Sequence, residues 1–137
     1  MPQYDDCIIF LLAKAYQKAH GLFKNRLQAH GLTPVQHLIL EVLWEEEGLS
    51  AGDIGKRVLL DGATLSGVLD RMADAGWLVR QSDENDKRFV RIYLTTRAKA
   101  LKTSLLDERR GANDEILQHF SVEEKVLLKR LLRDLQA

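Results

Sequence analysis

The sequence is poor in the residues that build disulfide frameworks and membrane spans. Its single cysteine, Cys7, excludes an intrachain disulfide and a four-cysteine zinc site. The longest apolar run, residues 7–13, is far shorter than the roughly 20 residues of a membrane-spanning helix. Asp5 and Asp6 precede this run, where a secretory signal carries basic residues. We therefore expect a protein of the cytoplasm, without a membrane partner.

Excess charge is also missing. The 20 Lys and Arg residues balance the 20 Asp and Glu residues, so the chain lacks the positive surplus that attracts nucleic acid without regard to sequence. This argues only mildly against DNA binding, because acidic residues such as 45–47 can lie away from the bound face of a dimer. The length of 137 residues and the apolar share of 45% indicate a single domain over residues 1–137.

Motifs that carry catalysis are absent as well. The sequence contains no phosphate loop, nucleophile elbow or dinucleotide fingerprint, so we expect neither an enzyme nor a bound cofactor. The histidines are spread over at least three predicted helices without the spacing of four residues that places two ligands on one helix face: His20, His30, His37 and His119. We therefore expect no metal site.

Helical periodicity dominates what is present. Apolar stripes and capping residues predict six helices: residues 6–29, 34 to a stop at Gly48, 51 to about 58, 62 to about 76, 96 to about 120, and a last helix after Ser121. Thr33 is expected to cap the second helix, with Pro34 at its first position, where the missing N–H of proline costs nothing.

A β-hairpin is expected between the fourth and fifth helices. Side chains alternate from Phe89 to Leu94, which is typical of a strand with one face in the core. Residues 77–80 supply a partner strand, and the polar segment 82–87 forms the tip. A charged hairpin that follows a pair of short helices predicts a winged helix-turn-helix, a mainly α fold with a small β-hairpin wing.

Several short segments, taken in their order, resemble the MarR family of transcriptional regulators over nearly the whole chain. They are residues 32–36, 49–50, 70–72 and 76–80, and the Asp86-x-Arg88 pair ahead of residues 94–95. The resemblance implies a DNA-binding core over residues 32–95. It also implies that residues 1–31 and 96–137 form dimerisation helices that interlock with those of a second chain.

The terminal helices independently favour a homodimer. Their apolar stripes, within residues 9–23 and 128–135, are larger than a small winged-helix core can cover. A two-fold dimer buries both stripes at once.

Two groups of residues are candidates for DNA contacts. The second helix of a helix-turn-helix pair enters the major groove with its N-terminal residues, and here that end and the following turn carry Thr64, Ser66, Gly67 and Arg71. At the wing, Arg88 suits a narrow minor groove, Lys87 a phosphate, and Asp86 an orienting role that the resemblance implies. The alternatives are ordinary surface hydroxyls on the helix and a solvated turn with a weak ion pair at the tip.

The expected function is that of a ligand-responsive repressor that binds a pseudo-palindromic operator in double-stranded DNA. We expect the effector, an aromatic or apolar acid, between the first helix and the core, near Tyr16, His37 or Trp44. The alternative in another class is an interaction module that uses the same dimer scaffold without DNA.

Cys7 offers an alternative mode of regulation. A peroxide-sensing branch of the family carries a reactive cysteine in the first helix, although Cys7 falls slightly early in that pattern. A low thiol pKa would need a nearby cation or a free helix N-terminus, and a cysteine in such an apolar segment is more often a packed, inert residue. We therefore predict no redox role for Cys7.

Overall fold

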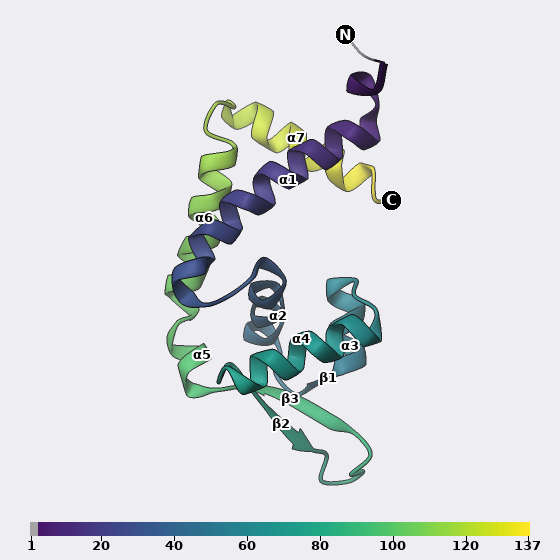
Figure 1. Cartoon of the computed structure of the whole chain (residues 1–137), viewed down its shortest axis with the longest axis vertical. Helices are drawn as coiled ribbons and strands as arrows, with labels where there is room; N and C mark the ends of the chain where they lie inside the picture. Colours follow the sequence, from purple (N-terminus) through teal and green to yellow (C-terminus); the bar gives the residue numbers. More distant parts are fainter. Residues whose placement is uncertain (1–2) are drawn as a thin grey trace.

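The computed structural model describes residues 3–137 and divides into two helical parts (Figure 1). One part contains two long helices that pack against each other, α1 (Ile8–Leu27) and α6 (Lys102–Ile116), and a third that follows α6, α7 (Val122–Asp134). The other part contains α2 (Pro34–Glu45), α3 (Ala51–Val58), α4 (Gly62–Asp74) and the sheet, with α5 (Thr96–Ala100) as the connection to α6. The winged helix-turn-helix arrangement predicted from the sequence is confirmed.

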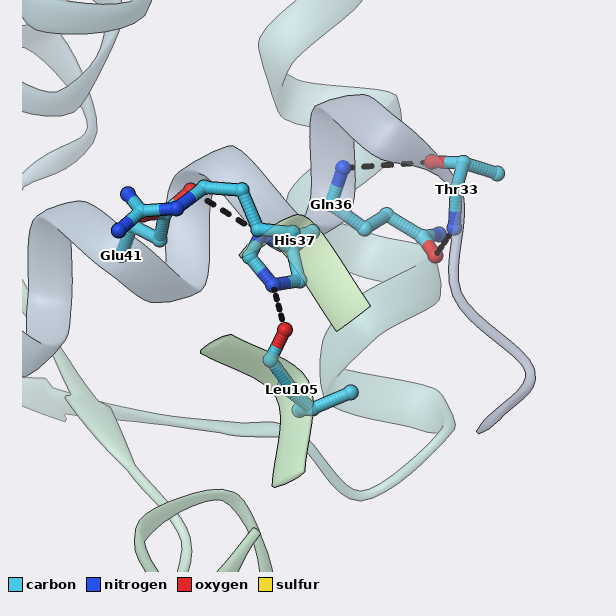
Figure 2. Close-up of polar contacts among 6 residues, drawn as sticks. Thr33, Gln36, His37, Glu41 and Leu105 are labelled. Carbon is cyan, nitrogen blue, oxygen red and sulfur yellow. Dashed lines mark hydrogen bonds and ion pairs between the residues drawn. The ribbon is translucent and has the colours of Figure 1, made fainter. Parts of the chain in front are cut away.

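Capping residues begin the helices where the sequence indicated. Thr33 and Gln36 form a reciprocal pair at the start of α2, in which each side chain accepts from the other residue's backbone N–H (Figure 2). Ser121 and Glu124 repeat this arrangement at α7. These bonds satisfy N–H groups that have no partner inside the helix. The starts of both helices are therefore fixed by local chemistry.

The predicted single helix over residues 96–120 is wrong, because α5 and α6 are separate and α6 ends at Ile116. Trp44 supplies a physical reason for the break. Its indole N–H donates to the carbonyl of Ala98 at 3.1 Å, and in a continuous helix that carbonyl would accept from the backbone N–H of Lys102. Leu101 lies at the break with φ −91° and ψ 3°.

The sheet has three antiparallel strands in the order β1-β3-β2, one more than the predicted hairpin. The hairpin consists of β2 (Leu78–Ser82) and β3 (Val90–Leu94), and the additional β1 (Leu49–Ser50) pairs Leu49 with Ile92. The expected alternation holds at the base of β3, where Ile92 and Leu94 are buried, whereas Val90 near the tip is exposed. A strand of two residues is too short to show any alternation, so β1 could not be detected in the sequence.

The hydrophobic core lies mainly between α2, α3, α4 and the sheet. Its largest fully buried side chains include Leu40, Ile54, Leu69, Met72 and Trp77. By contrast, the N-terminal half of α1 leaves large apolar side chains exposed: Ile8, Ile9, Leu11, Leu12 and Tyr16. Among residues 3–137, no helix is both long enough and apolar enough to cross a membrane.

Candidate nucleic-acid interface

The N-terminus of α4 is organised by Asp61. Its carboxylate accepts from the backbone N–H of Thr64 at 2.8 Å and from the Thr64 hydroxyl at 3.0 Å. Both bonds lower the pKa of Asp61, and the bond from the backbone N–H has the larger effect. The Thr64 hydroxyl proton is therefore committed to the cap, and the oxygen keeps its acceptor capacity toward solvent.

Ser66, Gly67 and Arg71 lie on the next turns of α4. Ser66 and Arg71 are exposed, and a Cβ placed on Gly67 would lie 3.5 Å from Nη1 of Arg71. The guanidinium of Arg71 therefore lies along the helix surface beside Gly67. With Thr64, these residues form one cluster on α4.

The wing tip holds a second cluster, separated from the first along the hairpin (Figure 1). Arg88 donates to both carboxylate oxygens of Asp86, through Nε at 3.0 Å and Nη2 at 2.9 Å, and its backbone N–H donates at 3.1 Å. The side chain of Arg88 is nevertheless 89% exposed. Hydrogen bonding to Arg88 lowers the pKa of Asp86 and raises that of the guanidinium. The wing therefore presents an oriented cation to solvent, with the exposed Lys87 beside it.

Two further carboxylates, which the sequence reasoning missed as positioning groups, hold the wing against the core. Asp83 accepts from Nε of Arg91 at 2.7 Å, which lowers the pKa of Asp83, and Arg91 also donates to the carbonyl of Gly48 at 2.9 Å. Asp70 on α4 accepts from Arg80 on β2 at 2.5 Å. The partners lie eight to 43 residues apart, so no local pattern reveals them.

A hollow of about 470 Å³ lies between α3, α4 and the sheet. Its polar wall includes Lys56, Ser66, Asp70 and Arg80. Asp70 is paired with Arg80, so these two charges offset each other. The concave surface beside α4 therefore carries an additional cation, Lys56.

The proposed effector residues do not share one cavity. Tyr16 lines a hollow of about 320 Å³ between α1 and α6, together with His20, Phe23 and Arg109. Trp44 lines a separate hollow of about 220 Å³, in which Arg109 is again part of the wall. Arg109 was not recognised in the sequence, where an arginine on an exposed helix carries no signal.

His37 lies outside both of these hollows. It is fully buried, and its two ring nitrogens bond to Glu41 and to the carbonyl of Leu105. The expectation that His37 contacts an effector directly therefore does not agree with its surroundings, because both polar atoms of the ring are already occupied.

Cys7 precedes α1 and is exposed in the single chain, unlike the packed residue that its apolar neighbours suggested. The backbone N–H groups of Phe10 and Ile9 at the start of the helix lower the pKa of its thiol below the ordinary 9.0. The thiol thus meets one of the conditions for reactivity named above, proximity to a helix N-terminus.

Comparison with known proteins identifies the family. A model described as the MarR family matches residues 30–88. A solved structure of a probable transcriptional regulator from Pseudomonas aeruginosa is 32% identical and superimposes with a TM-score of 0.91 over 97% of this chain and 99% of that one. The chain belongs to the MarR family.

Other MarR-type proteins agree with this assignment. The regulator TtmR of Methylorubrum extorquens is 37% identical over 122 residues, which cover 79% of this chain but only 61% of the relative. This chain therefore spans less than two thirds of that relative's length. The structure of BpsR from Bordetella bronchiseptica is 25% identical, with a TM-score of 0.91 and coverage of 99% and 97%. It was solved to explain how 6-hydroxynicotinic acid regulates the DNA binding of BpsR.

Proposed function

We propose that this MarR-family chain is a ligand-responsive transcriptional repressor of the cytoplasm that binds double-stranded DNA as a homodimer. The observation that carries the proposal is the oriented guanidinium of Arg88, held by Asp86 at two points and still 89% exposed. An ion pair with a purely structural role would not require the guanidinium to be exposed to solvent. A fixed, solvent-facing arginine on a wing is suited to the negative potential of a narrow minor groove.

The α4 cluster is positioned for the major groove. Its exposed groups, Ser66 and Arg71, can donate to phosphates or base edges, and Gly67 permits close approach. Lys87 supplies a phosphate contact beside Arg88. Since few cations lie on α4, we expect base contacts to be few and DNA shape to contribute much of the specificity.

The second copy is supported by the uncovered faces of the terminal helices. None of residues 122–134, the whole of α7, is buried, and its exposed apolar residues include Val126, Leu127, Leu131 and Leu132. α7 and α1 lie in the same part of the molecule (Figure 1). A dimer formed there leaves both copies of α4 free to enter grooves about 34 Å apart, one helical turn of duplex.

The DNA proposal is tested by selecting bound duplexes from a random pool. A homodimer with two reading heads should enrich a two-fold symmetric motif, and its affinity should fall steeply with salt because phosphate contacts release counterions. A chain that enriches no motif and shows no salt-dependent binding to random duplex would be an interaction module instead.

We further propose that the effector is an aromatic acid bound in the hollow lined by Tyr16, Phe23 and Arg109. The aromatic rings and the arginine offer a flat apolar wall and a partner for a carboxylate. The behaviour of BpsR, which responds to an aromatic acid, supports this chemistry. Trp44 is then a wall of the adjoining hollow, and Arg109 connects the two.

Regulation requires unequal affinity of the effector for the DNA-bound and free forms. A tenfold loss of DNA affinity corresponds to about 1.4 kcal/mol of coupling, and DNA must weaken effector binding by the same factor. Aryl carboxylates and phenols are titrated against free protein and then against the protein–DNA complex. Compounds that bind free protein without changing DNA affinity would refute the coupling. Failure of the whole class to bind would remove only the effector assignment.

A further inference from the structure

A fully buried histidine lies at the junction between the two parts of the molecule. His37 on α2 lies between Glu41, one turn further along the same helix, and the carbonyl of Leu105 on α6 (Figure 2). Its Nε2 atom is 2.8 Å from that carbonyl oxygen, and its Nδ1 atom is 3.1 Å from Oε2 of Glu41. A peptide carbonyl only accepts hydrogen bonds, and so does an ionised carboxylate.

A neutral imidazole cannot satisfy both partners. It carries one N–H, so either tautomer of His37 would direct a lone pair at an oxygen atom in a site closed to water. Protonation of Glu41 would remove the conflict. However, the guanidinium of Arg109 donates to the other oxygen of Glu41, Oε1, and this favours the ionised carboxylate.

We propose that His37 is a doubly protonated imidazolium cation in the folded protein, and that it is the positioning residue that joins the DNA-binding core to α6. Two donors then meet two acceptors. Burial of a charge is costly unless it is paired and hydrogen-bonded, and the imidazolium has both a carboxylate and a carbonyl as partners.

Two aromatic rings and one further ion pair complete the surroundings of His37. The ring of Phe23, from α1, lies 5.0 Å from the imidazole centroid at 72°, and the ring of Trp44 lies 5.8 Å away at 85°. Both aromatic rings stand nearly perpendicular to the imidazole, in a T-shaped arrangement. The charged groups that face His37 are Glu41 from α2 and, beyond that carboxylate, Arg109 from α6. The positive charge of Arg109 opposes that of His37, and Glu41 lies between them.

This cluster ties α2, which belongs to the DNA-binding core, to α6, which belongs to the proposed dimerisation part. His37 reaches the backbone of α6, and Arg109 reaches back from α6 to Glu41. Loss of the second proton would remove one of these bonds and direct a lone pair at an oxygen. The next step rests on the proposed function. In a DNA-binding dimer, a looser contact between α2 and α6 disturbs the spacing of the two α4 helices. DNA affinity should therefore fall as pH rises.

The protonation state is tested directly by nitrogen NMR of the full chain labelled at histidine. We expect both ring nitrogens of His37 to carry a proton at neutral pH. Glu41→Gln should convert one of them to a bare nitrogen, because it removes the balancing charge. Arg109→Gln should leave both protonated, because Glu41 then serves His37 alone. A bare nitrogen in the wild type would overturn the imidazolium assignment, independently of any DNA measurement.

The positioning role is tested by DNA affinity as pH rises from neutrality, where His37 is proposed to carry both protons. If one charge-assisted hydrogen bond is lost and its whole free energy is transmitted to DNA binding, the affinity of the wild type should fall about tenfold with rising pH. His37→Gln, which is neutral throughout, should bind weakly and lack that fall. His119→Gln, at an exposed position, is the matched control and should keep the wild-type profile.

The outcomes separate the two proposals. If His37→Gln and the wild type show the same pH profile, the positioning role is refuted. If Glu41→Gln, which removes the partner and keeps His37, also retains the wild-type fall, the role is refuted without relying on a change of His37 itself. If the wild type binds no DNA at any pH, both the proposed function and the positioning role fail, and the NMR result still decides whether His37 is an imidazolium.

Discussion

The two parts of the molecule differ in how completely one chain covers them. In the winged-helix part, α2 and α4 each bury four residues, and Trp77 is only 2% exposed. In the terminal part, Leu27 is the one buried residue of α1 (residues 8–27), and α7 (residues 122–134) buries none. Apolar surface left in water costs roughly 25 cal/mol per Å² relative to burial. The first part closes its own core, whereas the second leaves apolar faces of α1 and α7 uncovered, and these are the faces of the proposed dimer.

The junction between these parts combines apolar contacts of Leu27 and Leu105 with a group of polar contacts. The cluster of His37, Glu41 and Arg109 connects α2 to α6 through directional hydrogen bonds. Apolar contacts tolerate small shifts, but a hydrogen bond weakens steeply when its geometry changes. A signal that passes from the terminal helices to α4 would therefore be expected to cross this junction.

The largest expected effect comes from Leu131→Lys, which places a charge in the proposed dimer face. We expect loss of the dimer and destabilisation by about 3 kcal/mol or more, because an unpaired charge would be buried. Sedimentation of the wild type should show twice the 15.6 kDa chain mass, and the variant should not. Leu59→Lys, at a leucine that is 88% exposed on the other part, is the control and should stay dimeric. A stable, folded wild-type monomer would contradict the comparison between the two parts.

The next effect belongs to the winged-helix part alone. Arg88→Ala should weaken binding to the selected DNA motif by about 1–3 kcal/mol without changing the dimer, the range for one specific contact. Lys87→Ala should lower affinity for all sequences similarly and reduce the salt slope by about one. Fluorescence titration at several salt concentrations measures both. Negligible and equal effects would show that the wing does not touch DNA.

A smaller effect is expected from acid at the wing. The pKa of Asp86 lies below its ordinary 3.8 in the folded chain, so the contribution of its pair with Arg88 is present above that value. It is lost as pH falls through the lower, folded pKa. The Nε–H signal of Arg88 in NMR should therefore broaden only in strong acid, and in Asp86→Asn it should be broad at every pH. Broadening of the wild-type signal already well above 3.8 would contradict the depressed pKa.

The smallest effect is predicted for Cys7 in the terminal part. Although its thiol is exposed and has a lowered pKa, we keep the prediction that it has no redox role. Peroxide at low stoichiometry should leave DNA affinity unchanged in the wild type and in Cys7→Ser. Release of DNA from the wild type but not from the variant would establish the peroxide-sensing alternative.

Much of the fold was predictable because its signals are local. Thr33, Asp61 and Ser121 each accept a backbone N–H three residues further along, so a cap can be recognised within four residues of sequence. The buried stripe of α4 and the base of β3 follow the helical and strand periods for the same reason. The orienting role of Asp86 was implied by the family resemblance, and its partner in the structure is Arg88, two residues further along.

The sequence by itself therefore determined the caps, the buried faces, the wing and its arginine, because these depend on neighbours within one or two turns of the chain. Only the tertiary structure decided the features that depend on distant partners. Ala98 meets Trp44 across 54 residues, and this interrupts the predicted fifth helix. Leu105 meets His37 across 68 residues, and this changes a proposed effector contact into a buried junction. Tertiary packing brings such groups together, and the periodicity of apolar residues in the sequence does not indicate which pairs will meet.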